Sequence, residues 1–406
     1  MKIVLVTSGQ PSLNPRLVKE ADTLSFAGYE VTVLYTYWND WGTKLDVTLL
    51  KTKKWKAIRV GGDPEQKPLV YLFSRIMHKL TICGAKKTRL KYFAEFAISR
   101  NSYWLMKAAS ARHADLYIAH NLGALPAVIK AAKHHNKPCG FDAEDFHRNE
   151  VSDDPHNFDV LLKACIEDKY IPQTDYLTAS SPQIGEAYRK LFPSKEPIII
   201  LNVFKKNLDI KATHIKPDTP LKLFWFSQTI GTNRGIEEVL KALGTINHRK
   251  FELHLMGKLQ HNISKGHFEK LAGHTFYSLY FHDPIAPDDL TVFASQFDVG
   301  LALEPAFSFN NDMALSNKIF TYMQAGLAII ASNTTAQRIL LQRQPEIGKV
   351  YEIGNVQSLS NILQHYAENT DEVYKARQAS LHLAQTSLNW ETEQLMFLNI
   401  IDTFNR

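Results

Sequence analysis

The chain has 406 residues, of which 45% are hydrophobic and 22% are charged, and its formal net charge is +6. This length exceeds what one hydrophobic core usually organises, so we expect two domains. No apolar run approaches the roughly 20 residues that span a bilayer, and the opening MKIVLVTSG lacks the pattern of a secretory signal. Three widely spaced cysteines without metal-ligand spacing predict free thiols in a reducing, cytoplasmic compartment: Cys83, Cys139 and Cys165.

The first half of the chain alternates strands with helices. Residues 2–7 and 30–37 have the composition of strands, and between them Asn14 caps a helix whose first residue is Pro15. Four further strands are expected at 115–119, 138–143, 176–180 and 197–201. Such alternation predicts a parallel sheet with helices on its faces.

The second half repeats this pattern after a polar segment, 206–220, that we interpret as a linker. Its strands are expected at 221–227, 251–256, 275–281, 298–304 and 327–332, with a helix at 236–244. We therefore predict two doubly wound, Rossmann-like α/β domains that face a cleft, at 1–205 and 221–385, followed by a terminal helical segment at 386–406. Ligands of such sheets bind beyond the carboxyl ends of the strands.

Three cations stand at the starts of predicted helices. Ser316 is a good N-cap that places Lys318 in the first turn, Arg234 precedes Gly235 at the start of another helix, and Arg16 lies in the first helix. A cation is unfavourable at this end of a helix by roughly 0.3–1 kcal/mol unless an anion binds there. Two such cations in the second domain predict a diphosphate site. The alternatives are that Lys318 extends into solvent, and that Arg16 either serves an acceptor or is solvated.

The segment 68–112 is basic and aromatic. It holds nine lysines and arginines but a single acid, Glu95. A basic amphipathic segment of this kind can lie on an anionic membrane surface. The alternative is a pair of helices packed on the core with a solvated basic face. No motif for binding nucleic acid accompanies the charge.

Several runs of the sequence resemble glycosyltransferase family 4 over nearly the whole chain. They are SLNPRLVKEADTLSFAGYEVTVLY at the start, the RG pair at 234–235, LMG at 255–257, NKIFTYMQAGLAIIAS at 317–332 and NWE at 389–391. The resemblance implies the GT-B fold and a retaining transfer from a nucleotide-diphosphate sugar. It also implies that the N-terminal domain binds the acceptor, that the C-terminal domain binds the nucleotide, and that the final helix packs back on the N-terminal domain.

The resemblance assigns roles to particular residues. Asn14 and Arg16 would lie on the acceptor side, and His120 would face the donor sugar or the leaving group. Arg234 and Lys318 would act in catalysis by stabilising the departing diphosphate. Five residues would bind the donor nucleotide: Gly235, Gly257, Ser316, Asn317 and Thr321.

The sequence departs from the family pattern in the donor pocket. Many members carry an arginine where this chain has Gln228, and a pair of glutamates at the positions of Met313 and Thr321. The second of these glutamates holds the ribose in the family. Asn317 and Lys318 would replace part of that pocket, so the resemblance does not identify the nucleotide base.

Acidic residues and histidines follow two strands of the first half. His120 comes after one strand, and FDAEDFHRNE at 141–150 offers Asp142, Glu144, Asp145 and His147. We expect Glu144 to act as a catalytic carboxylate that accepts the proton of the acceptor, against the alternative of local caps and ion pairs. A diphosphate held by two cations needs neither a metal nor a cofactor, so we expect none.

Three functions are consistent with these features. The first is a glycosyltransferase (hexosyl type) that acts on a glycan or polyprenyl-linked acceptor in cell-surface polysaccharide synthesis. The second is a nucleotide-sugar 2-epimerase on the same fold, and the third is a non-catalytic scaffold that binds sugar nucleotides. We expect a cytoplasmic protein, with peripheral attachment to the inner face of the membrane through 68–112 as the alternative to a freely diffusing one.

Overall fold

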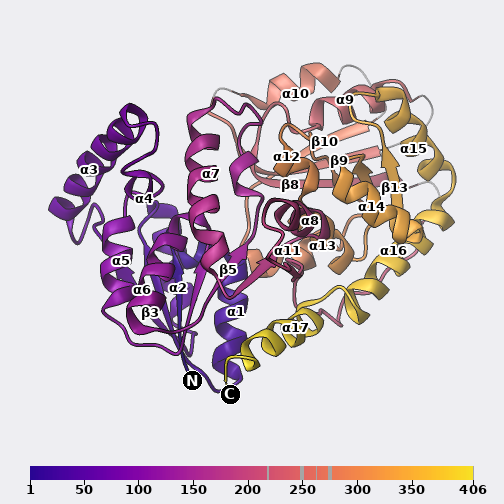
Figure 1. The fold of residues 1–406 in the computed structure, drawn as a ribbon. Helices are drawn as coiled ribbons and strands as arrows, with labels where there is room; N and C mark the ends of the chain where they lie inside the picture. The colour runs from indigo at the N-terminus through magenta and orange to yellow at the C-terminus, as the bar shows by residue number, and fades with distance from the viewer. Residues whose placement is uncertain (217–218, 247–250, 262, 273–276, 406) are drawn as a thin grey trace. The chain divides into compact units, whose positions relative to one another are not determined.

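The computed structural model describes residues 1–216, 219–246, 251–261, 263–272 and 277–405 (Figure 1). The chain forms two compact units. Unit 1 contains Met1–Leu201, Ser308–Asn310 and Gln394–Arg406, and unit 2 contains Asn202–Phe307 and Asn311–Glu393. Each unit is built on its own sheet, so the two are described separately.

Unit 1 is built on a seven-stranded, wholly parallel sheet with the strand order β3-β2-β1-β4-β5-β6-β7. Its strands are β1 (Lys2–Thr7), β2 (Glu30–Thr36), β3 (Lys56–Val60), β4 (Leu116–His120), β5 (Cys139–Ala143), β6 (Tyr176–Ala179) and β7 (Ile198–Ile199). The side chains of β4 and β5 are buried throughout, as expected of central strands covered on both faces.

Nine helices belong to the described part of unit 1, and the last of them starts in unit 2. They are α1 (Pro15–Phe26), α2 (Asp40–Leu50), α3 (Pro68–Lys87), α4 (Ala94–Ala97), α5 (Ser102–Ser110), α6 (Leu125–His135), α7 (Phe158–Tyr170), α8 (Pro182–Leu191) and α17 (Trp390–Asp402). As predicted, the Asn14 side chain caps α1 by accepting a hydrogen bond from the backbone N–H of Leu17. Helix α1 packs against β1 and β2.

Unit 2 is built on a six-stranded parallel sheet with the order β10-β9-β8-β11-β12-β13. Its strands are β8 (Leu221–Ile230), β9 (Phe251–Leu259), β10 (Tyr277–His282), β11 (Val299–Ala302), β12 (Ala328–Ser332) and β13 (Gly348–Tyr351). Its helices are α9 (Ile236–Gly244), α10 (Lys265–Ala272), α11 (Pro287–Ala294), α12 (Phe309–Met313, shared with unit 1), α13 (Asn317–Gln324), α14 (Thr335–Arg343), α15 (Val356–Glu368) and α16 (Thr370–Thr386). A cluster of buried aliphatic and aromatic side chains from β8, β9, α9 and α15 forms one side of its core.

Both sheets confirm the predicted fold class of two doubly wound parallel domains. The eleven predicted strands are present with ends shifted by at most three residues, and residues 275–276 of the strand expected at 275–281 lie outside the described residues. The edge strands β3 and β13 were not predicted. The described residues between Ile200 and Pro220 form neither helix nor strand.

The strand order determines where a ligand site is expected in each unit. In unit 1 the chain proceeds outward from β1 in one direction through β2 and β3, and in the other direction from β4 onward. In unit 2 the same reversal falls between β8 and β11. At such a switch point the loops that follow the two strands separate and leave room at the carboxyl edge of the sheet.

Candidate functional site

The loop after β8 presents the first predicted cation of unit 2. Arg234 is exposed, and its guanidinium donates a long hydrogen bond of 3.4 Å to the Ser227 hydroxyl. The next residue, Gly235, has a φ of +77° and directly precedes α9. A Cβ on Gly235 would lie 2.6 Å from the Cβ of Leu303, so only glycine lets this turn pack so closely against the end of β11.

The second predicted cation, Lys318, does not extend into solvent. Ser316 caps α13, as predicted, and the Lys318 ammonium lies 2.7 Å from the Glu304 carboxylate. Both side chains are largely buried, with 16% and 13% of their surface exposed. No acid occupies the first turn of α13. Glu304 therefore supplies the negative charge that stabilises both the positive end of the α13 dipole and the Lys318 ammonium.

The charge state of Glu304 follows from these contacts. Burial by itself raises the pKa of this carboxyl group, but the Lys318 charge and hydrogen bonds from Lys318, Ser316 and Asn311 outweigh it and lower the pKa. Glu304 is therefore ionised at neutral pH. Sequence reasoning missed this residue, although its position at the carboxyl end of the strand predicted at 298–304 was a signal that could have identified it.

Arg234 and Lys318 belong to the same edge of the unit 2 sheet. The Arg234–Gly235 turn packs on Leu303, the neighbouring residue Glu304 pairs with Lys318, and β8 lies beside β11. The turn that carries Arg234 and the Lys318–Glu304 ion pair therefore both lie at the switch point of unit 2, on either side of the residues that follow β11.

The remaining predicted donor residues have structural contacts of their own. Gly257 has a φ of +151°, and a Cβ there would lie 2.5 Å from the carbonyl oxygen of Ser227. The exposed Asn317 accepts a hydrogen bond of 2.9 Å from the Asn202 amide. Thr321 is buried, and its hydroxyl donates to the carbonyl oxygen of Asn317 at 3.0 Å. Gly257 therefore packs closely on β8 and Asn317 is exposed at the start of α13, whereas the side chain of Thr321 is turned into the helix.

A row of polar side chains crosses the unit 1 sheet at its switch point. The register pairs Thr7 with His120, His120 with Asp142, and Asp142 with Thr178, so four neighbouring strands contribute one residue each. Paired residues of a parallel sheet point to the same face. The Thr178 hydroxyl donates to Asp142 at 2.6 Å.

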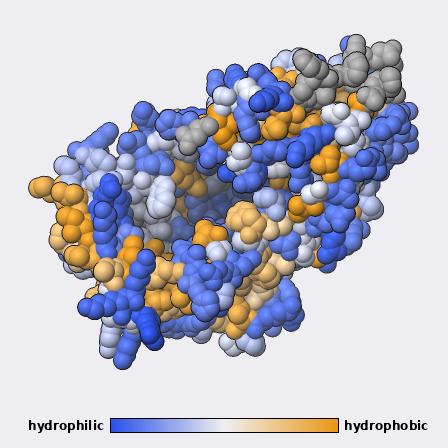
Figure 2. Space-filling model, turned by 90° about the horizontal axis from the view of Figure 1, so that it is seen from above, coloured by the Kyte–Doolittle hydropathy of each residue, from blue (hydrophilic) through white to orange (hydrophobic). Residues whose placement is uncertain are grey.

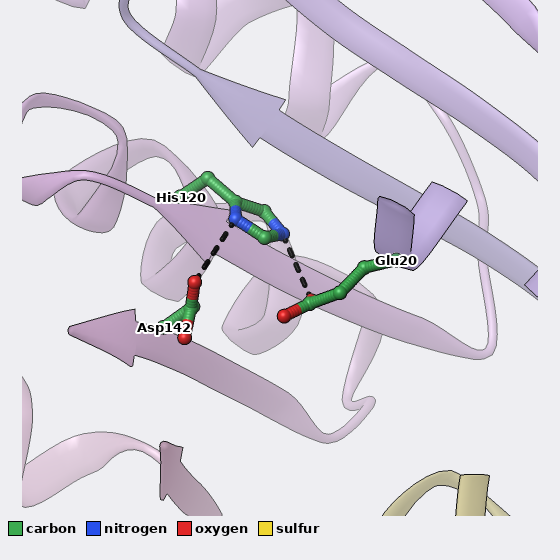
Figure 3. Close-up of side chains that lie close together, drawn as sticks. All are labelled: Glu20, His120 and Asp142. Carbon is green, nitrogen blue, oxygen red and sulfur yellow. Dashed lines mark ion pairs between the residues drawn. The ribbon is translucent and has the colours of Figure 1, made fainter. Parts of the chain in front are cut away.

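Helix α1 completes this row with Arg16 and Glu20. The His120 ring lies between two carboxylates, with Nε2 3.1 Å from Glu20 and Nδ1 3.3 Å from Asp142 (Figure 3). Arg16 Nε donates to Asp142 at 2.6 Å, and another guanidinium nitrogen donates to the carbonyl oxygen of Ile200. All four side chains are almost completely buried. We refer to Arg16, Glu20, His120 and Asp142 as the buried charge cluster.

Opposite charges set the protonation states in the buried charge cluster. Burial by itself lowers the pKa of His120, but the Glu20 charge and the contacts with Asp142 and Glu144 raise it well above its usual value. Burial raises the pKa of Asp142, yet the Arg16 charge and His120 reverse this and lower it. Burial and the nearby Asp142 charge raise the pKa of Glu20. His120 is therefore an imidazolium ion that neutralises buried carboxylates.

Glu144 links the buried charge cluster to the surface. One of its carboxylate oxygens lies 3.7 Å from His120 Nδ1, and its side chain is 24% exposed. The next acid, Asp145, accepts a hydrogen bond of 2.9 Å from the amide of Asn310, and His147 lies 3.6 Å from Glu150. Of the carboxylates predicted after β5, Glu144 alone contacts His120 and also reaches solvent.

The two residues predicted on the acceptor side are buried. The Asn14 side chain caps α1, and the Arg16 guanidinium donates hydrogen bonds to Asp142 and to a backbone carbonyl oxygen. Arg16 is therefore not solvated. Two aromatic residues that the sequence analysis did not identify are exposed in the same unit: Trp38 between β2 and α2, and Trp41 in the first turn of α2. The buried Gln10 holds this turn by accepting hydrogen bonds from the backbone N–H groups of Trp38 and Asn39.

A cation could also be considered for the buried charge cluster. One ligand atom each from Glu20, His120 and Asp142 lies within 4.8 Å of the others, and among the described residues this is the group with such an arrangement. However, the Arg16 guanidinium already contacts Asp142 and supplies a positive charge at this place. The residues present therefore fit an internal ion-pair network better than a metal site.

Comparison with known proteins identifies the fold. No protein-family model and no curated protein matches the sequence. The structure is similar to HepE from Anabaena, crystallised in complex with UDP, with a TM-score of 0.68, 14% identity and coverage of 99% of this chain and 100% of HepE. It is also similar to the lipopolysaccharide outer core galactosyltransferase WaaB, with a TM-score of 0.65, 14% identity and coverage of 99% of both chains.

A third similar structure is a putative UDP-N-acetylglucosamine 2-epimerase from Listeria monocytogenes. Its TM-score is 0.55 at 13% identity, with coverage of 99% of this chain and 96% of the other. Identities this low establish the arrangement of the backbone and leave the activity open. The predicted architecture is confirmed: the chain has the GT-B fold, with two Rossmann-like units.

Proposed function

We propose that the protein is a retaining glycosyltransferase that takes a sugar from a nucleotide-diphosphate sugar. The observation that carries this proposal is that the Arg234–Gly235 turn and the Lys318–Glu304 ion pair both lie at the switch point of unit 2. Two helices begin there, and their free backbone N–H groups add to the positive potential. The UDP complex of the similar protein HepE supports a nucleotide as the ligand.

The diphosphate would be the group that unit 2 stabilises. As the bond to the sugar breaks, negative charge develops on the phosphate, and fixed cations lower the energy of that state. Lys318 has three N–H donors, and its bond to Glu304 leaves others for phosphate oxygens. Glu304 would hold the ammonium in place, while the exposed Arg234 closes on the other side of the diphosphate.

In unit 1 we propose that Glu144 is the carboxylate that meets the acceptor. It has both the solvent access to reach a hydroxyl group and a contact with His120. His120 is buried, so it acts on Glu144 and not on the sugar itself. This revises its predicted role from a residue that faces the donor to one that positions a carboxylate.

The acceptor is proposed to be a glycan or a lipid-linked sugar in the synthesis of a cell-surface polysaccharide. Trp38 and Trp41 offer exposed rings on which the apolar face of a sugar can pack. The similarity to WaaB, a lipopolysaccharide galactosyltransferase, supports an acceptor of this class. Retaining transfer could proceed on one face of the sugar without a nucleophile of the protein: the acceptor hydroxyl attacks the anomeric carbon as the bond to phosphate breaks, and its proton passes to Glu144 or to the leaving phosphate.

A panel of nucleotide sugars tests the donor site. A ligand at 100 times its dissociation constant adds about 2.7 kcal/mol to the free energy of unfolding, which is visible as a rise in melting temperature. We expect at least one of the UDP-, GDP-, ADP- and TDP-sugars to raise it. If none does so at millimolar concentration, the proposal is wrong.

Two substitutions test the assigned cations. With the donor found by the panel, we expect Arg234→Ala and Lys318→Ala each to lower the rate of donor turnover about 100- to 1,000-fold, because each removes a charge that stabilises the leaving group. Lys241→Ala is the matched control, since Lys241 is an exposed cation in the last turn of α9. Equal activity of all three variants would contradict the assignment.

The same assays separate the two alternative functions. An epimerase would convert the donor sugar to its C2 epimer without an acceptor. The similarity to a putative 2-epimerase is the reason to test this function. However, His120, Asp142 and His147, which it could use at C2, are buried in this chain. A scaffold would bind a nucleotide sugar without turnover, so hydrolysis that is lost in Arg234→Ala excludes it.

A further inference from the structure

Helix α3 directs its large apolar side chains to solvent. Its buried residues are small or polar: Ser74, Thr81 and Ala85. Leu69 and Leu80 are 82% and 60% exposed, and between them the helix also exposes Leu72, Phe73 and Ile76. Positions 69, 72, 73, 76, 80 and 83 follow one another at helical spacing, so they form one continuous stripe. A surface helix of a globular protein normally has the opposite orientation.

Specific contacts hold α3 in this orientation. The Thr81 hydroxyl and the His78 ring bond the backbone carbonyls of Phe96 and Ala97, at 3.2 and 2.9 Å. Gly84 lets the Phe93 ring approach, since a Cβ there would lie 3.0 Å from the ring. The inward face is therefore anchored to α4, and the apolar stripe is the face that the fold leaves uncovered.

The flank of the stripe is basic. Arg75, Lys79 and Lys86 are exposed along one side of α3, and Lys87 follows at its end. Residues 68–87 contain no acid, and Glu95, the acid of the wider segment, is paired with Lys169. Figure 2 shows hydrophobic side chains next to hydrophilic ones at the left edge of the view, the side on which Figure 1 places α3.

We propose that α3 docks on an anionic lipid surface, with the stripe in the interface and the basic flank against the headgroups. This combination of an apolar face and neighbouring cations is what interfacial helices present to acidic lipids. No helix among the described residues is long and apolar enough to cross a membrane, so α3 would lie along the surface. The charge favours lipid over a second copy of the chain, whose identical basic flank would repel it.

Of the two interpretations of segment 68–112, this inference favours a membrane surface over helices that pack on the core with a solvated basic face. It goes beyond the transferase assignment, because vesicle binding can be measured whatever the reaction is. It also gives a reason for an acceptor that resides in a membrane.

A fluorescent label on Cys83 tests the docking face directly. Cys83 is exposed and belongs to the stripe, whereas Cys139 is buried. The full chain with Cys165→Ser is labelled at Cys83 with a polarity-sensitive dye and mixed with vesicles. We expect a blue shift and quenching by spin-labelled lipid with 30% phosphatidylglycerol, and little change with phosphatidylcholine alone. An unchanged spectrum with both vesicles would overturn the proposal.

Substitutions separate the two contributions. Arg75→Gln with Lys79→Gln should weaken binding to acidic vesicles about 25-fold, since each cation near an anionic surface contributes roughly fivefold. Leu72→Gln with Ile76→Gln should abolish the blue shift. The matched control is Arg189→Gln with Lys190→Gln, which removes two exposed cations from α8 and should leave binding unchanged.

Two further results would contradict the proposal. If the α8 control weakens binding as much as the α3 variant, the attraction comes from net charge alone. If the Leu72 and Ile76 variant converts a dimer to a monomer in sedimentation, the stripe is covered by a second copy of the chain. Unchanged melting temperatures of the variants show that a loss of binding does not reflect unfolding.

Discussion

His120 illustrates how burial changes the chemistry of a single residue. Its ring meets Glu20 on one side and Asp142 and Glu144 on the other, with the Arg16 guanidinium bound to Asp142. In water a histidine is mostly neutral at pH 7, but here the carboxylates raise its pKa. The imidazolium ion is therefore part of the folded structure and contributes to its stability.

This predicts that the difference in free energy of unfolding between the protein and a His120→Gln variant depends on pH. Because the folded pKa lies above the unfolded one, the stabilisation is complete below about pH 6.5 and is lost as the pH rises through the folded pKa. Between the two pKa values, the difference in free energy of unfolding should fall by about 1.4 kcal/mol per pH unit. Urea unfolding of both proteins from pH 6 to pH 10 measures it.

The variant is needed because another group titrates in this range. Burial and the charge of Arg16 lower the pKa of Lys19 to about 7, so the pH profile of the protein alone mixes two effects. Lys19 is present in both proteins, and its contribution cancels in the difference. A difference that stays constant from pH 6 to pH 10 would mean that His120 is neutral in the folded state.

At the scale of elements, the turn between β8 and α9 depends on glycine. Gly235 and Gly354 have nearly the same φ, +77° and +80°, but a Cβ on Gly235 would overlap Leu303, whereas Gly354 has nothing within 4 Å. Alanine at either position costs about 1–2 kcal/mol for the left-handed backbone. We expect Gly235→Ala to cost about 1–3 kcal/mol more from overpacking.

Urea unfolding of the two alanine variants measures this difference. Gly235→Ala should also weaken binding of a nucleotide sugar, because the displaced turn carries Arg234, whereas Gly354→Ala should bind as the unsubstituted protein does. Equal losses of stability in both variants would show that Leu303 moves aside without cost.

The elements were largely readable from the sequence because their signals are local. Continuous apolar runs marked the central strands, and caps such as Asn14 and Ser316 marked helix starts. Edge strands β3 and β13 were missed because they are only half buried, and charged residues interrupt the short segments KAIRV and GKVY. Their identity depends on the neighbouring strand, which the local pattern does not contain.

The candidate site was less predictable because its contacts are distant in sequence. Lys318 was identified, but its partner Glu304 lies 14 residues away in another element. Arg16 on α1 and Asp142 on β5 are separated by 126 positions, and the register of β4 and β5 places His120 beside Asp142. A residue type can suggest an ion pair, but the strand register selects the partner.

At the scale of the whole molecule, unit 1 depends on the end of the chain. Phe397 and Ile401 of α17 are buried in it, and the Tyr29 hydroxyl bonds Asp402. Deletion of 394–406 should therefore cost unit 1 about 3–6 kcal/mol, counting two buried apolar side chains. We expect hydrogen exchange to show faster exchange in β1 and β5, with β8 and β11 unchanged.

A control distinguishes the lost packing from a general effect of the terminus. Leu395 and Met396 are exposed on the same helix, so alanine at both positions should leave the exchange of β1 unchanged. If the deletion increases exchange equally in both units, then α17 supports the molecule as a whole and the assignment of 394–406 to unit 1 is wrong.

The division of the chain between the units also determines the order in which they can be completed during synthesis. Unit 1 holds 394–406 in addition to Met1–Leu201, and 394–406 follow every residue of unit 2 in the sequence. Because a chain is synthesised from its amino end, all of unit 2 is translated while unit 1 still lacks 394–406. Until those residues emerge, the nascent protein carries the uncovered apolar surface that α17 occupies in the folded unit.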